Sequence, residues 1–295
     1  MEPTCERTVV VGVDGSPEAL VAARWAVWQA ALRGLDVQLV YSYPLPLMDA
    51  PVCSSFFDDF AEAGRTVLAE ALGALEVPPA VAVSTLVAET LPTLLMQRLS
   101  RTAVLVVVGQ HATAWYDRLG RGSVVSPLAH HAGCPVVVVP PTWRQGGDDG
   151  RPVVVAVDGE ATAAAALDLA FDEAAMRGAE VVALHTDAGR TPEQTEAAER
   201  DVAALLARAR AGRPATPARV VAVRGDASKV ILAAAQSAAL LVVGPPHTEG
   251  RTTWTRSVAR HVLTTVECPL VVMPRHRPGP GSPVLTRSDV VLVAS

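Results

Sequence analysis

The feature that most restricts how this chain can fold is an internal repeat. Residues 8–34 read TVVVGVDGSPEALVAARWAVWQAALRG and residues 152–178 read PVVVAVDGEATAAAALDLAFDEAAMRG, and the two align without a gap. The copies also end alike: LVVVGQ and HHAGCPVVVVPP in the first correspond to LLVVGP and TVECPLVVMP in the second. A repeat of this length predicts two domains of one fold, and a chain of 295 residues has the length for two.

Within each copy, short Val/Leu runs alternate with longer Ala-rich segments of helical period, which is typical of a parallel sheet covered by helices. The expected strands lie near residues 8–13, 36–42, 80–86, 103–108 and 135–139, and then near 153–157, 180–185, 218–223, 239–243 and 270–273. Helices are expected in the first copy near 17–33, 56–75, 89–100 and 123–132. The predicted fold class is α/β, as two tandem, open, Rossmann-like domains of five parallel strands each.

The first helix carries its own start and stop signals. Ser16 is a helix-capping residue type, Pro17 suits the first helical position, and Gly34 is a permissive residue after the last periodic position. We place the first domain at 1–143 and the second at 151–276, joined by the linker RQGGDDG. Residues 277–295 form a C-terminal tail whose DVVLVAS segment is read either as an extra edge strand or as a frayed end.

Composition excludes several classes of function. Half the residues are hydrophobic, yet no apolar run reaches the length that crosses a bilayer, and the polar, acidic N-terminus lacks a secretory signal pattern. We therefore expect a cytoplasmic protein without a membrane span. A formal charge of −5 and a pI near 5.8 argue against nucleic acid as a partner. Lysine occurs only at Lys229, an arginine-for-lysine bias typical of a GC-rich bacterial genome.

The four cysteines give no sign of a metal or disulfide framework. No C-x-x-C pair joins them, and they are far apart in the sequence, at Cys5, Cys53, Cys134 and Cys268. The sequence also contains no G-x-S-x-G, H-E-x-x-H or G-x4-G-K-[ST] motif, so hydrolase, zinc-protease and Walker-type functions lack support. We expect no protein metal site and no catalytic residue.

Several residues of the first copy fall where an open parallel sheet binds ligands, beyond the carboxyl ends of its strands. Asp14 follows the first strand, Val40 to Ser42 end the second, and Gly109 follows the fourth. Asp14 is read either as a turn and helix-cap residue or as an acceptor for a sugar hydroxyl or a base amine.

The stretch after the fourth strand, VVVGQHATAWYDRLGRGSVV, also has two readings. Gly109 would leave the strand with a positive φ, Gly122 would allow close approach of the backbone, and Ser123 could cap the next helix or donate to a phosphate. Glycines at these points are equally common where a strand ends in a long turn and where the next helix begins. Spacing alone leaves both readings open.

Taken together, the VDGS after the first strand, the G-x2-G-x9-G-[ST] spacing after the fourth and the closing H-x-x-CPVVVVP strand resemble the universal stress protein family. The resemblance covers nearly the whole chain as two copies. It implies a five-stranded parallel α/β fold and, in the nucleotide-binding members, ATP held with a divalent cation, which we take as Mg²⁺. Transferred to this sequence, the motif implies a nucleotide site formed by Asp14, Val40, Gly109, Ala112, Gly122, Ser123 and Val124. Ala112 stands where the family has its second glycine.

The second copy departs further from the motif. Its counterparts are Asp158, Gly244 and Ser257, which form a weaker candidate site. His247 replaces the second glycine, and Pro245 and Pro246 remove amides that a phosphate would use. We expect no phosphate-binding loop of the standard form here. Arg251 and Arg256 offer side-chain cations in place of the missing amides.

The resemblance therefore implies a stress-response protein that binds ATP in its first domain and acts as a nucleotide-dependent sensor or regulator, with slow or no hydrolysis. One alternative is an interaction-type stress protein that binds no nucleotide. A second is an adenine-nucleotide-using enzyme of the same superfamily. We expect the two domains to pack through their terminal PVVVVP and PLVVMP strands as a pseudo-dimer within one chain. A second copy of the chain, in a homodimer, is a further expected partner.

Overall fold

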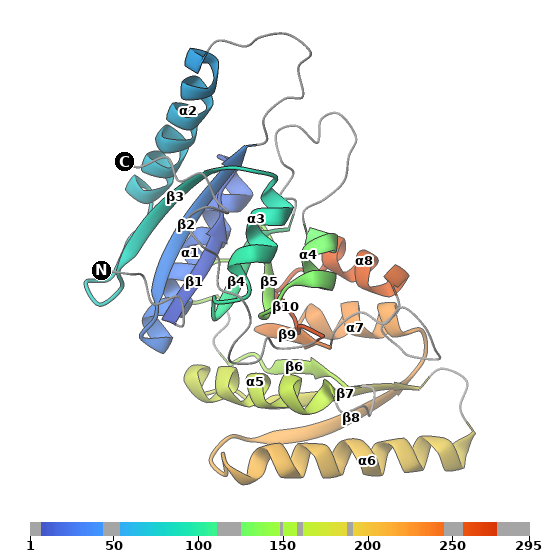
Figure 1. Ribbon diagram of the computed structural model, residues 1–295. Helices are drawn as coiled ribbons and strands as arrows, with labels where there is room; N and C mark the ends of the chain where they lie inside the picture. Colours follow the sequence, from blue (N-terminus) through green and yellow to red (C-terminus); the bar gives the residue numbers. More distant parts are fainter. Residues whose placement is uncertain are drawn as a thin grey trace. The chain divides into compact units, whose positions relative to one another are not determined.

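A computed structural model describes the chain over seven segments and shows two compact units, one within Met1–Pro141 and one from Thr142 to Arg275. Each unit is described below by itself (Figure 1). The described segments are 7–43, 54–110, 125–147, 150–157, 162–187, 191–244 and 256–275. The C-terminal tail lies outside them.

In the first unit, strands and helices alternate along the chain, as the repeat pattern predicts. The elements are β1 (Thr8–Gly12), α1 (Pro17–Arg33), β2 (Asp36–Tyr43), α2 (Ser54–Gly73), β3 (Val83–Glu89), α3 (Pro92–Leu99), β4 (Leu105–Gly109), α4 (Val125–His131) and β5 (Val136–Val139). The strands pair in parallel in the order β3-β2-β1-β4-β5. The predicted α/β class with five parallel strands is confirmed.

The strand order decides where a ligand can enter this sheet. From β1 the chain steps outward to β2 and β3, then returns past β1 to β4 and β5. Helices α1 and α2 pack on β2 from one side, whereas α3 packs on β1 and β2 and lies beside α4 (Figure 1). The order therefore reverses between β1 and β4, which is the point where open α/β sheets leave a crevice beyond the carboxyl ends of their strands.

The second unit repeats this plan. Its elements are β6 (Val153–Ala156), α5 (Thr162–Arg177), β7 (Val181–Asp187), α6 (Pro192–Ala211), β8 (Ala218–Arg224), α7 (Ala227–Ala235), β9 (Leu240–Val243), α8 (Arg256–Thr265) and β10 (Leu270–Val272). The strand order β10-β9-β6-β7-β8 is that of the first unit read from the other end. Its reversal point lies between β6 and β9.

Local sequence explains why α1 begins and ends where predicted. The hydroxyl of Ser16 accepts a hydrogen bond from the amide of Ala19 at 3.1 Å, and Pro17 occupies the first helical position. Gly34 ends the helix with a φ of 63°, a left-handed conformation that favours glycine. Apolar side chains of β1 and β2 form the core of the sheet, where Val9, Val11 and Leu39 are fully buried.

Strand β3 lies three residues later than predicted, at Val83–Glu89 instead of 80–86. The amide of Val81 donates to the carbonyl of Pro78, so a turn uses the first residues of the expected strand. Pairing of Val37 with Val83 then fixes the register with β2. Because β3 runs to Glu89, helix α3 starts at Pro92, three residues after the predicted start.

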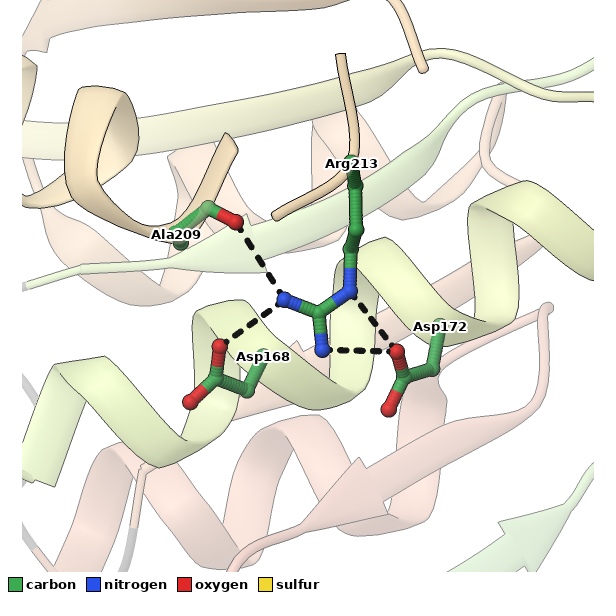
Figure 2. Close-up of polar contacts among 4 residues, drawn as sticks. All are labelled: Asp168, Asp172, Ala209 and Arg213. Atoms are coloured by element: carbon green, nitrogen blue, oxygen red, sulfur yellow. Dashed lines mark hydrogen bonds and ion pairs between the residues drawn. The ribbon is translucent and has the colours of Figure 1, made fainter. Parts of the chain in front are cut away.

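An ion-pair cluster joins two helices of the second unit. Arg213, just beyond α6, donates to Asp172 of α5 at 2.8 Å and to Asp168 at 3.1 Å, and it also donates to the carbonyl of Ala209 (Figure 2). Asp168 and Asp172 are one helical turn apart, so one guanidinium reaches both. This exposed cluster fixes the end of α6 on α5.

None of the helices in the described segments is long and apolar enough to cross a membrane.

Candidate functional site

Asp14 lies at the reversal point of the first sheet, two residues after β1. Its Oδ1 atom accepts hydrogen bonds from the amide of Ser16 at 3.0 Å and from the hydroxyl of Ser16 at 2.5 Å. That hydroxyl is itself the cap of α1, so a chain of hydrogen bonds links the carboxylate to the helix. Ser16 therefore holds the carboxylate, which is half-buried at the edge of the sheet. These contacts confirm the turn reading of Asp14, and its reading as an acceptor for a sugar hydroxyl or a base amine stays a prediction.

Gly15 completes this turn. Its φ is 83°, in the left-handed region where a side chain is strained. An added Cβ would meet the methyl groups of Val67 on α2 at 3.6 Å, so the turn lies directly against that helix. The Asp-Gly-Ser sequence thus sets the position of Asp14 through a backbone conformation as well as through hydrogen bonds.

Gly109 ends β4 beside β1, but not for the reason the sequence suggested. The prediction of a positive φ is wrong, because Gly109 is not among the left-handed glycines of the described residues. A Cβ there would lie 2.9 Å from the carbonyl carbon and 3.0 Å from the carbonyl oxygen of Glu18. Gly109 is therefore needed for close packing of the first turn of α1 onto β4, which holds Asp14 and Gly109 at the same edge.

Val40 is the predicted site residue on β2. It is 3% exposed, and its carbonyl accepts a hydrogen bond from the amide of Val13, which extends the β1–β2 ladder toward Asp14. The next residue, Tyr41, was not predicted individually. Burial and the nearby charge of Asp14 both raise the pKa of its phenol. The signal that could have identified it was a tyrosine within the stretch from Val40 to Ser42, near the carboxyl end of β2.

The rest of the predicted phosphate loop, Ala112, Gly122, Ser123 and Val124, lies outside the described residues. Their part in the site remains a prediction.

The corresponding edge of the second unit has different chemistry. The amide of Val157 donates to the carbonyl of Leu184, as Val13 does to Val40. At the place of Tyr41, however, stands His185, which is fully buried with its Nδ1 atom 2.9 Å from the carbonyl oxygen of Val157. Gly244 has no positive φ, and a Cβ added there would meet nothing within 4 Å.

Two further predicted residues of the second unit are not placed by the structure. Asp158 and the side chain of Ser257 lie outside the described part of the chain.

Cys134 and Cys268 are both buried. Among the described residues no group of three His, Cys, Asp or Glu side chains is arranged to hold a metal ion.

Comparison with known proteins assigns both units. The model of the universal stress protein family matches residues 6–140 and 150–274. A universal stress protein of Mycobacterium tuberculosis is 33% identical over 261 residues, covering 80% of this chain and 85% of that protein. The crystal structure of a universal stress protein from Archaeoglobus fulgidus is similar with a TM-score of 0.66 at 17% identity, covering 91% of this chain and 96% of that one.

Shorter solved chains of the family also match. One from Archaeoglobus fulgidus is in complex with dAMP, with a TM-score of 0.36, 22% identity, and coverage of 42% of this chain and 98% of that chain. Another is in complex with cAMP, with a TM-score of 0.33, 26% identity, and coverage of 45% and 96%. Because the family model matches most of the sequence in two successive regions, this chain belongs to the universal stress protein family, with two of the family's domains in tandem.

Proposed function

We propose that the first unit binds ATP at the carboxyl ends of β1 and β4 and that the chain acts as a nucleotide-dependent sensor or regulator in a stress response. The observation that carries this proposal is the fixed carboxylate of Asp14 at the reversal point of the sheet. Ser16 occupies Oδ1, so the second carboxylate oxygen is available to accept from a sugar hydroxyl or a base amine.

The proposed site extends from Asp14 and Val40 through Gly109 to Ala112, Gly122, Ser123 and Val124. Asp14 and Val40 would hold the nucleoside end, and the loop that begins at Gly109 would hold the phosphates. Since no carboxylate and histidine cluster for a metal exists among the described residues, Mg²⁺ would enter with the phosphates of the nucleotide. The proposed location of the protein is the cytoplasm.

Asp14 has a binding role in this proposal and no catalytic one. Its Oδ1 already accepts hydrogen bonds from the amide and the hydroxyl of Ser16, which orient the carboxylate for binding. It also stands at the nucleoside end, away from the phosphorus that water would attack. We therefore propose that hydrolysis of ATP is slow or absent. The protein would instead respond to whether a nucleotide occupies the site.

The second candidate function is an interaction-type stress protein without a nucleotide. The observations that favour it are the replacement of a motif glycine by Ala112 and, in the second unit, the buried His185 bonded to the carbonyl of Val157.

Purification of the full chain, followed by denaturation and identification of released nucleotides, tests the proposal directly. We expect an adenine nucleotide, and a melting temperature that rises in millimolar ATP with Mg²⁺. Asp14→Ala and Gly122→Glu should abolish both effects. If the native chain carries no adenine nucleotide and ATP leaves its melting temperature unchanged, the nucleotide proposal is wrong and the interaction-type function stands.

Asp226→Ala is the matched control for Asp14→Ala. Asp226 caps α7 and likewise accepts from a neighbouring hydroxyl, that of Ser228 at 2.7 Å, and from a backbone amide, that of Lys229 at 3.1 Å. Its loss removes the same kind of local network in the second unit. This variant should lower stability while keeping the response to ATP.

A further inference from the structure

Strand β3 is the outermost strand of the first unit, and within the described segments it pairs with β2 and with no other strand. The amide of Val37 donates to the carbonyl of Ala82 at 2.9 Å, and the pairing with β2 then runs without interruption along all of β3. In such a parallel ladder, alternate residues of a strand bond to the same neighbour. Thr85 and Val87 therefore direct their backbone amide and carbonyl groups away from β2, to the outer side of β3.

This outer side lacks the features with which proteins usually protect the edge of a sheet. An exposed strand edge pairs readily with other strands, and charged side chains, prolines or bulges normally prevent this. Residues 83–88 read VSTLVA, with no charge and no proline, and the continuous register with β2 leaves no bulge in β3. Ser84 and Thr85 are exposed. An uncharged edge of this length favours a further strand as its cover.

The outermost strand of the second unit has the protection that β3 lacks. Strand β8 carries Arg219 and Arg224, both exposed, near its two ends. The side chain of Arg219 is held by Glu180, because its Nε atom donates to a carboxylate oxygen at 3.2 Å. Charged side chains of this kind disfavour an added strand. The two units therefore differ at matching edges, since β8 is protected by charge and β3 is not.

One segment outside the described residues has the composition of a further strand. Residues 290–293 read VVLV, and no other stretch outside the described segments contains four consecutive Val or Leu residues. The run is similar to the buried strand VVVV of β5. Residues 276–288 precede it and are rich in Pro and Gly. When extended they span about 40 Å, roughly twice the width of a five-stranded sheet. Such a tether raises the local concentration of the segment to the order of millimolar.

We propose that residues 289–294 of this chain pair with the outer side of β3 as a sixth strand of the first sheet. The backbone groups of Thr85 and Val87 supply the hydrogen bonds on the β3 side. The segment covers the uncharged edge, so that the edge of one copy does not pair with that of another. This contact does not involve the proposed nucleotide site, and it forms whether or not ATP binds.

Hydrogen–deuterium exchange of the full chain, followed by mass spectrometry, tests the pairing. The double substitution Val291→Pro and Leu292→Pro removes two adjacent amides, one for each side of the proposed strand. We expect the amides of Thr85 and Val87 to exchange about tenfold faster in this variant, the effect of losing one or two hydrogen bonds. The exchange of β8 should not change.

Val284→Pro with Leu285→Pro is the matched control, because the same two residue types are replaced in the tail before the segment. It should leave the exchange of β3 as in the wild type. Unchanged exchange of β3 in the 291–292 variant would overturn the inference. An equal acceleration in the control would do so too, because the sequence of residues 289–294 would then not determine the contact.

Thr85→Pro tests the same contact from the side of β3. The Thr85 amide points away from β2, so this substitution keeps the β2–β3 ladder and removes one hydrogen bond to the segment. We expect residues 290–294 to be protected from exchange in the wild type and to lose that protection in Thr85→Pro. Protection that persists in the variant would place the segment on another surface. Protection that rises with protein concentration would assign it to a second copy, and either result contradicts the proposal.

Discussion

At the scale of single residues, Ser16 couples the stability of α1 to the orientation of Asp14. One hydroxyl donates to the carboxylate and accepts from the amide of Ala19, so it serves the helix and the candidate site at once. The second copy has glutamate, Glu160, at the corresponding position. The sequence predicted the cap, whereas the bond to Asp14 depends on the conformation of the turn.

Replacing Ser16 by alanine should therefore have two effects. We expect a loss of about 1 kcal/mol in unfolding free energy from the missing cap, and a several-fold weaker affinity for ATP from a less restrained carboxylate. Thr191→Ala is the control, since Thr191 caps α6 in a capping box in the second unit. Denaturant unfolding and calorimetry of both variants give the two quantities. Comparable stability losses with unequal ATP affinities support the coupling, whereas equal affinities contradict it.

The charge of Asp14 should also be measurable at Tyr41. Asp14→Asn removes a negative charge that disfavours the phenolate, so the pKa of Tyr41 should fall toward the value that burial alone sets. Ultraviolet absorbance of phenolate against pH, with Tyr41→Phe subtracted to assign the signal, measures the change. An unchanged titration would show that the two groups do not interact.

The same raised pKa has a consequence for stability. Above pH 10 the unfolded chain releases the phenolic proton while the folded chain keeps it. The stabilisation linked to Tyr41 is thus fully present below pH 10 and is lost as the pH rises through the folded-state value. Unfolding free energies should fall less steeply with alkaline pH in Tyr41→Phe than in the wild type.

At the scale of elements, the contact between β4 and α1 forms the edge on which the candidate site depends. Most element spans could be predicted, because apolar runs and helical periodicity are local in sequence. The role of Gly109 could not, since its close neighbour is Glu18, far away in the chain. For the same reason the close packing of the Tyr41 ring on Gly64 of α2 was not predicted. The shifted start of β3 depended on the turn at Pro78, which the apolar pattern does not reveal.

Alanine substitutions at Gly109 and Gly244 compare this contact between the units. Gly109→Ala brings a Cβ to 2.9 Å from the backbone of Glu18, so α1 must shift, at a cost of about 1–3 kcal/mol. Gly244→Ala meets no neighbour within 4 Å and should change stability by less than about 0.5 kcal/mol. Chemical unfolding measures both. Equal effects of the two substitutions would refute the packing role of Gly109.

At the scale of the whole molecule, the two units share strand order and helix placement but differ in the side chains at the reversal point. The first unit has Asp14 fixed by Ser16 with Tyr41 nearby, whereas the second has a buried histidine at the matching place on β7. A shared fold therefore does not imply shared binding, because the ligand is recognised by these few side chains and not by the sheet.

This difference predicts one adenine nucleotide per chain. The carboxylate held by Ser16 occurs in the first unit, and Pro245 and Pro246 leave the loop of the second without two amide donors. Calorimetric titration of the full chain should give a stoichiometry near one, and Gly122→Glu should reduce it to zero. Two equivalent sites, or one site that survives Gly122→Glu, would place nucleotide binding in the second unit and contradict the assignment. A stoichiometry of one that Gly122→Glu abolishes would assign nucleotide binding to the first unit alone.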